Sequence, residues 1–244
     1  MQNIEKYLKR SSIKEGLETQ PMSDQDVELI TKVINNSPTS TNSQQFSAII
    51  IRDQEMKDFI SIKNWNQGHV KNNNAFILFI GDRTRTNIIK KEAKVNESEL
   101  MKKNEFLRIT VDATIAATYA MSALMDMNYA CTMIGGVVGF ANELEKKLNI
   151  PSDSMIVLGL VVGKTKTPGV VKPKMNKVFL EKYDVEQAKK DINEYEENTK
   201  DWFIKYTKSS WKDSVIRIAD KNERFAKPFE VAGKYIQDKY ESME

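Results

Sequence analysis

Two runs of consecutive apolar residues constrain the fold of this chain most strongly. AFILFIGD at 75–82 and SMIVLGLVVGK at 154–164 hold almost no polar side chains over a length that suits a strand. A strand with one solvated face alternates apolar and polar residues, whereas a continuously apolar strand is covered on both faces. Both runs are therefore predicted to be strands inside a layered protein core.

Further strands and helices follow from the local pattern. FSAIIIRD at 46–53 is predicted as another strand buried on both faces, and CTMIGG at 131–136 as a strand that runs into glycines. Helices are predicted from apolar spacing or from charge patterning over 24–35 with Ser23 as N-cap, 55–63, 141–150, 184–206 and 211–240.

Residues 106–127 are predicted as a helix that is apolar on more than one face. Such a helix must be surrounded by protein, either within one chain or at the contact with a second subunit. The lysine-rich segment 83–105 before it is predicted to be an exposed helical excursion or lid. Because the chain shows no internal repeat or low-complexity linker, residues 1–244 are predicted to form a single domain.

The composition describes a soluble globular protein, with 40% hydrophobic and 29% charged residues. The N-terminus MQNIEKYLKR lacks the apolar core of a secretory signal, and no segment suits a membrane span. A cytoplasmic location without membrane attachment is therefore expected. The net charge of +3 does not call for a nucleic acid as partner.

The counts of cysteine and histidine exclude several kinds of chemistry. Cys131 is the only cysteine and His69 the only histidine, which excludes an internal disulfide and leaves little room for a Ser-His-Asp triad. No metal site is expected. Cys131 lies in an apolar run, so a buried, inert thiol is favoured over a nucleophile.

The polar motifs that remain are dispersed along the chain, and no Walker or GxGxxG motif is present. Two of them, 10–14 (RSSIK) and 172–174 (KPK), carry cations that suit a phosphate, although each alone is also typical of solvated surface. Gly135–Gly136 either makes a turn or lets a ligand approach the backbone. Gln67 and the loop SPTSTNSQQF at 37–46 add hydrogen-bonding side chains in what could be ordinary loops.

Taken together and in this order, these motifs resemble the nitroreductase family of FMN-dependent oxidoreductases, in the branch of oxygen-insensitive NADPH nitroreductases and flavin reductases. The resemblance runs from about residue 8 to at least 180. It implies an α+β fold with a central mixed or antiparallel sheet flanked by helices, an intertwined homodimer, and a helical C-terminal extension over 184–244.

The resemblance also assigns roles to residues of the N-terminal half. Lys14 is the counterpart of an arginine near flavin N1 and O2, and is expected to be the catalytic residue. Ser12 belongs to the same motif, and either Arg10 or Ser11 takes the place of its first arginine. Three residues match a loop that contacts FMN across the dimer interface: Ser40, Thr41 and Asn42.

Further cofactor-binding residues are implied downstream. Gln67 matches a glutamine that contacts the flavin, and Lys172 and Lys174 match a phosphate clamp in which lysine replaces arginine. Four residues match a loop whose backbone faces the isoalloxazine ring: Met133, Ile134, Gly135 and Gly136. Because lysine contacts phosphate as a point charge and arginine contacts it bidentately, weaker FMN binding than in relatives is expected.

The activity implied is that of an FMN-dependent NAD(P)H oxidoreductase that reduces small-molecule acceptors, namely nitroaromatics, quinones or free flavins, by ping-pong hydride transfer through flavin N5. NADPH and NADH both remain open as reductant, because the C-terminal loop offers only Lys205, Lys208 and Lys212. The alternatives are a flavin carrier or sensor with low turnover, and an interaction protein whose segment 83–105 docks on an acidic partner.

Overall fold

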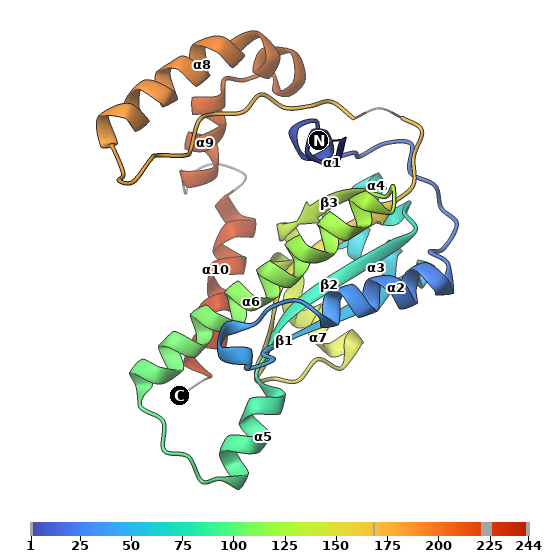
Figure 1. The fold of residues 1–244 in the computed structure, drawn as a ribbon, viewed down its shortest axis with the longest axis vertical. Helices are drawn as coiled ribbons and strands as arrows, with labels where there is room; N and C mark the ends of the chain where they lie inside the picture. The colour runs from blue at the N-terminus through green and yellow to red at the C-terminus, as the bar shows by residue number, and fades with distance from the viewer. Residues whose placement is uncertain (1, 168, 221–225, 243–244) are drawn as a thin grey trace. The chain divides into compact units, whose positions relative to one another are not determined.

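The computed structural model describes residues 2–167, 169–220 and 226–242. It divides into two compact units, one of residues 1–170 with 231–244 and one of residues 171–230. The larger unit holds the sheet and the helices packed on it, and the smaller unit is helical (Figure 1). Among the described residues, no helix combines the length and apolarity that crossing a membrane requires.

Four strands form one antiparallel sheet in the order β1-β2-β4-β3. Their bounds are β1 Phe46–Ile51, β2 Ala75–Asp82, β3 Ala130–Ile134 and β4 Ser154–Gly163. The strands predicted from apolar runs are thus confirmed, and the sheet is antiparallel throughout. The first strand packs against hydrophobic cores on both faces, with Ile49 on one and Ala48 and Ile50 on the other. Its predicted burial is only partial, because β1 lies at a sheet edge and is half-buried along most of its length.

Side chains of the central strand β2 point alternately to the two faces of the sheet, and a separate hydrophobic core lies on each face. Ile77 and Phe79 point to a core shared with α2 (Asp24–Asn35) and α6 (Glu99–Asp126). Phe76 and Leu78 point to the opposite core, which α3, η2 and α7 complete; these span Gln54–Lys63, Gly135–Phe140 and Ala141–Leu148. Because each face of the strand is covered, every residue of β2 is buried.

The predicted helices form close to their expected bounds. Ser23 caps α2 as predicted, since its Oγ accepts a hydrogen bond from the Asp26 N–H at 3.1 Å. The helix predicted over 106–127 begins earlier, at Glu99, because Ser98 caps it and its polar first turns hold good helix-forming residues. Short elements without a sequence prediction are α1 (Gln2–Leu8), η1 (Ser40–Asn42) and α4 (Gly68–Lys71).

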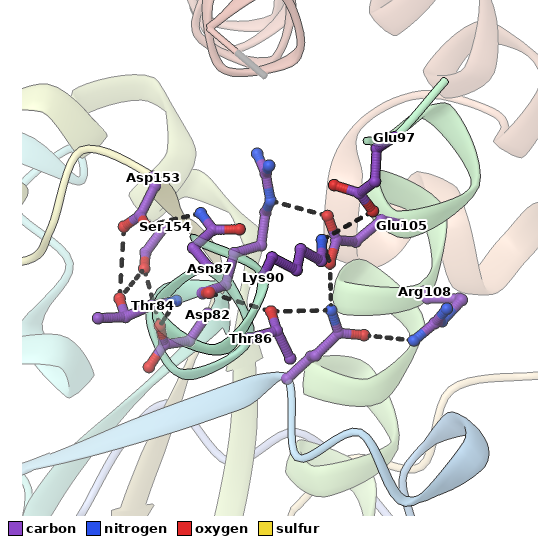
Figure 2. A network of polar contacts seen from close by, with 12 residues as sticks. Asp82, Thr84, Thr86, Asn87, Lys90, Glu97, Glu105, Arg108, Asp153 and Ser154 are labelled. Carbon is purple, nitrogen blue, oxygen red and sulfur yellow. Dashed lines mark hydrogen bonds and ion pairs between the residues drawn. The ribbon is translucent and has the colours of Figure 1, made fainter. Parts of the chain in front are cut away.

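The polar segment after β2 is anchored by a buried charge cluster (Figure 2). It forms α5 (Thr84–Glu92), a connection, and the first turns of α6. Glu105, buried on α6, accepts hydrogen bonds from Arg83 Nε at 3.0 Å and Lys90 Nζ at 2.6 Å. Gln45 Nε2 also donates to Glu105, at 2.5 Å. These contacts therefore join the start of the segment, next to β2, to the turns of α6 where the segment ends, and join both to the residue before β1.

The C-terminal helices are α8 (Val185–Thr207), α9 (Trp211–Ala219) and α10 (Ala226–Glu241). Aromatic rings join α8 to α9, where Tyr195 meets Trp211 edge-on at 5.3 Å between centroids. The last turns of α10 pack in the larger unit. There the buried Tyr235 hydroxyl donates to Glu145 at 2.6 Å and accepts from the Ile156 N–H at 2.7 Å.

Candidate functional site

The site is built around a strained turn that follows α3. Trp65 and Asn66 both adopt left-handed backbone conformations, with φ of 57° and 53°. Residues with a Cβ rarely adopt left-handed backbone angles. Two such residues in succession mark a strained turn that contacts with the surrounding structure must stabilise. Ser61 supplies two of those contacts, because its carbonyl accepts from the Asn66 N–H at 2.8 Å and its Oγ donates to the Gln67 carbonyl at 2.9 Å.

This turn meets the glycine loop at the end of β3. A Cβ placed on Gly136 would lie 2.2 Å from Asn64 Oδ1 and 3.1 Å from Cζ3 of the Trp65 ring. No side chain fits there without displacing the turn, so position 136 requires glycine for close approach rather than for its φ angle. The sequence segments around Gln67 and Gly136 therefore lie side by side.

Buried polar atoms without partners mark the wall of this site. The Asn64 side chain is 1% exposed, and neither its Oδ1 nor its Nδ2 has a hydrogen-bond partner among the described residues. His69 Nε2 is buried without a partner as well. Buried amide and imidazole groups are nearly always hydrogen-bonded in folded proteins, so these groups are candidates for contact with a bound water or ligand.

Lys14 belongs to the same site. The pKa of His69 is lowered to about 4, first by burial and then by the positive charge of Lys14. The N-terminal stretch is fixed over β3, where Thr132 Oγ1 donates to the Ile13 carbonyl at 3.1 Å. Of the residues predicted from the sequence, Lys14 thus acts on His69, two residues after Gln67, and Gly136 lies against Asn64 and Trp65, just before Gln67.

The side chains of Met133 and Ile134 pack in the protein interior. Ile134 is buried in the core beside α3 and α7, and Met133 packs against the core beneath α6. The Ile134 side chain is therefore turned away from a ligand, whereas Met133 is only partly buried. Gly135, by contrast, is exposed.

A basic cavity of about 600 Å³ lies on another side of the N-terminal stretch. Its lining includes Arg10 and Ser11, together with Lys166 and Thr167 from the segment after β4. Arg10 Nε is buried and has no hydrogen-bond partner within the described part of the chain. Ser12 and Lys14 do not line the cavity.

Cys131 lies under this cavity as a buried thiol, as predicted. Burial raises its pKa to about 12, and the charge of Arg10 offsets only part of that rise. A thiol with so high a pKa is a poor nucleophile at neutral pH.

The loop of Ser40, Thr41 and Asn42 is held by contacts away from Lys14. The Ser40 N–H donates to Asp112 Oδ1 of α6 at 3.0 Å, and the other oxygen of this buried carboxylate has no partner among the described residues. Thr41 and Asn42 adopt left-handed conformations, with φ of 52° and 56°. The loop therefore has a defined, strained shape on α6.

The lysine pair at 172–174 belongs to the smaller unit. Lys172 and Lys174 are both exposed. The proline between them is tied to α8, because Tyr195 Oη donates to the Pro173 carbonyl at 3.2 Å. The two cations are thus carried on a segment with a fixed backbone.

Sequence reasoning missed Asn64, Trp65 and Lys166 as site residues and gave no role to His69. Nothing in the local pattern distinguishes Asn64 from an ordinary helix C-cap or Lys166 from a surface lysine. The one available signal was the tryptophan, because Trp65 stands in a polar loop where a large aromatic side chain has no core to join.

A protein-family model described as Nitroreductase family matches residues 7–164 of the chain. Among curated proteins, an FMN reductase (NADPH) from Bacillus subtilis is 25% identical over 231 residues, which cover 91% of this chain and 92% of that relative. An NADPH-dependent oxidoreductase from Staphylococcus saprophyticus is 24% identical over 217 residues, covering 84% of this chain and 86% of the relative.

Solved structures agree in fold. The NfrA1 nitroreductase from B. subtilis superposes with a TM-score of 0.84 at 23% identity, covering 98% of both chains. The NADPH:FMN oxidoreductase from Vibrio harveyi, complexed with NAD+, superposes with a TM-score of 0.79 at 22% identity, again covering 98% of both chains. The family model covers well over half of the sequence and the same fold extends along the whole chain, so this protein belongs to the nitroreductase family.

Proposed function

We propose that this nitroreductase-family protein is an FMN-dependent NAD(P)H oxidoreductase that reduces nitroaromatics, quinones or flavins by a ping-pong mechanism. The observation that carries the proposal is the close approach of Gly136 to the turn of Asn64 and Trp65 that precedes Gln67, with the charge of Lys14 acting on nearby His69. The printed names of relatives, FMN reductase (NADPH) and FMN reductase [NAD(P)H], support it.

The residues present fit FMN. An exposed glycine loop offers backbone N–H groups, Gln67 offers an amide, and Lys14 offers a cation whose charge acts on His69. When bound, FMN supplies hydride and electron transfer through its isoalloxazine ring. The protein holds and orients the ring through the backbone of 133–136 and Gln67, and Lys14 stabilises negative charge at its edge.

The phosphate is assigned to the cationic groups. Arg10, Ser11 and Ser12 on the N-terminal stretch and the pair Lys172 and Lys174 remain its proposed ligands. The unpartnered Arg10 Nε in a cavity that also holds Lys166 supports an anion on this side of the stretch.

A homodimer is part of the proposal, with Ser40, Thr41 and Asn42 serving the flavin of the partner subunit. The exposed face of α6 supports it, because four apolar side chains follow one another at every fourth position: Leu107, Val111, Ile115 and Tyr119, exposed by 61%, 44%, 38% and 43%. A stripe of this kind on a long helix is typical of an interface. The loop at 40–42 is fixed to the same helix.

Ile115→Glu is expected to convert the protein to a monomer, because a carboxylate in the middle of the α6 stripe cannot be desolvated on association. Light scattering coupled to gel filtration would measure the mass. Ile89→Glu is the matched control, since Ile89 is an exposed isoleucine on α5 outside the stripe. A variant that keeps a dimeric mass would show that this face is not the interface.

Lys14→Ala is expected to lower the reduction potential of the bound flavin by about 20 to 40 mV, the equivalent of about 1 to 2 kcal/mol for two electrons. The reason is that a cation near the ring favours the reduced, more negative form. A dye-coupled titration measures the potential, and Lys14→Arg, which keeps the charge, is the control. An unchanged potential in Lys14→Ala would remove Lys14 from this role.

The function itself is tested by anaerobic stopped-flow. The purified protein should take up FMN, lose its yellow colour with NADPH or NADH, and regain it with a nitrofuran or a quinone. Uptake without turnover would favour the alternative, a flavin carrier or sensor. The comparison of the two nicotinamides tests Lys205, Lys208 and Lys212, the cations proposed to meet the 2′-phosphate of NADPH.

A further inference from the structure

Trp65 is an unusual residue in two independent ways. Its backbone is left-handed, with φ of 57°, a conformation that a bulky side chain adopts only under constraint. Its side chain is also 57% exposed, although burial of an indole is one of the largest apolar gains that a chain can make. Backbone strain and aromatic exposure at one residue are both unfavourable for folding alone, which points to a role in binding.

The contacts of Trp65 place its ring at the candidate flavin loop. Its Cζ3 lies near the space where a Cβ on Gly136 would be. The neighbouring Asn64 is buried against the same glycine, so the backbone that carries Trp65 is anchored on both sides, by Asn64 and by the Gln67 carbonyl contact. The Cζ3 edge of the ring therefore lies beside Gly136.

No ring or cation occupies the indole face among the described residues. The aromatic and cation–π contacts of the described chain involve other rings, such as Phe59 with Phe140 and Lys147 over Phe59. Trp65 thus offers an open, flat, electron-rich surface next to the loop that is proposed to face the isoalloxazine ring. Planar aromatic compounds stack on such a surface.

We propose that Trp65 is a specificity-determining residue that stacks on planar aromatic electron acceptors and holds them beside the Gly135–Gly136 loop. The inference rests on the proposed function and narrows it. Quinones and nitroaromatics gain the stacking contact, whereas a compact inorganic acceptor does not. The preference of the enzyme among electron acceptors then depends on the turn that carries Trp65 as well as on the flavin.

The test compares Trp65→Gly with Trp65→Phe. Glycine suits a left-handed backbone, so Trp65→Gly should fold normally, and phenylalanine keeps an aromatic face. In stopped-flow reoxidation of the NADPH-reduced enzyme, Trp65→Gly is expected to lower the second-order rate constant for menadione and nitrofurazone about five- to tenfold. Trp65→Phe should keep most of the wild-type rate constant for these two acceptors. Ferricyanide, which is not aromatic, should react equally with all three proteins.

A second readout does not depend on turnover. Menadione added to the FMN-free protein should quench the tryptophan emission of the wild type more than that of Trp65→Phe, because the variant keeps Trp202 and Trp211 but lacks the indole on which menadione is proposed to stack. FMN affinity, measured by titration, should be the same in the wild type and Trp65→Gly.

Three results would overturn the inference. They are equal loss of rate with ferricyanide and menadione, no loss with either, or a five- to tenfold loss of FMN affinity in Trp65→Gly, which would place the indole against the flavin instead. A wild type that takes up no FMN would refute the proposed function. The quenching experiment on the FMN-free protein would still decide whether Trp65 binds planar aromatic compounds.

Discussion

Glu105→Ala is expected to lower the free energy of unfolding by about 3 to 5 kcal/mol. Glu105 is 3% exposed and accepts hydrogen bonds from Arg83, Lys90 and Gln45. Figure 2 shows Lys90 directed at Glu105. Burial acts to raise the pKa of Glu105, but the hydrogen bond and charge of Lys90, followed by the charge of Arg83, hold that pKa below its ordinary value. Removal of the carboxylate leaves the buried Arg83 guanidinium without its counter-ion.

Urea unfolding at pH 7 measures this loss, and Glu143→Ala is the control. Glu143 pairs with Lys63 at 2.7 Å, but the two side chains are 50% and 38% exposed, so its loss should cost less than about 1 kcal/mol. Equal effects of the two variants would show that the buried cluster does not stabilise the segment between β2 and α6. Because this cluster lies away from Lys14 and Gly136, the potential of bound flavin should not change in Glu105→Ala.

Acid is expected to destabilise the protein through His69. Its pKa falls from an ordinary value of 6.5 to about 4 in the folded chain, so between these values the unfolded chain binds a proton that the folded chain does not. Stability from the neutral imidazole is therefore complete above pH 6.5 and is lost as the pH falls toward 4. At about 1.4 kcal/mol per pKa unit, roughly 2 kcal/mol is lost by pH 5 and about 3 kcal/mol by pH 4.

The measurement is the free energy of unfolding at pH 7 and pH 5 in the wild type and in His69→Gln. Carboxylates titrate in both proteins. The difference between the two losses of unfolding free energy therefore isolates the contribution of His69. Lys14→Gln should reduce the loss partly, since Lys14 is the smaller of the two causes of the lowered pKa. Equal pH dependence of wild type and His69→Gln would show that the imidazole is not held neutral by its surroundings.

Much of the secondary structure could be predicted from local sequence. The strand at 75–82 and the helix at 24–35 form with the predicted bounds, because apolar periodicity and a serine cap are local signals. The early start of α6 at Glu99 was not predicted. Its polar first turns show no apolar stripe, and the Glu105 cluster that anchors them comes from distant parts of the chain.

The candidate site could be predicted only in part. Its motif residues Lys14, Gln67 and Gly136 are predicted from the resemblance to the nitroreductase family. A resemblance compares residue types along the sequence and does not show where those residues lie in the fold. Asn64 and Trp65 could not be identified that way, because their significance lies in a buried amide without a partner and in a left-handed backbone. Neither property is encoded in the few residues around them.

The sequence by itself determined the continuous apolar run that buries β2 on both faces, the cap of α2, the buried state of Cys131 and the family to which the chain belongs. Tertiary structure alone decided that β1 lies at a sheet edge and that Lys14 acts on His69. It also decided that the turn at Trp65 closes on Gly136. The physical reason is that periodicity and capping depend on neighbours in the chain, whereas burial, pKa and close approach depend on which distant segments pack together.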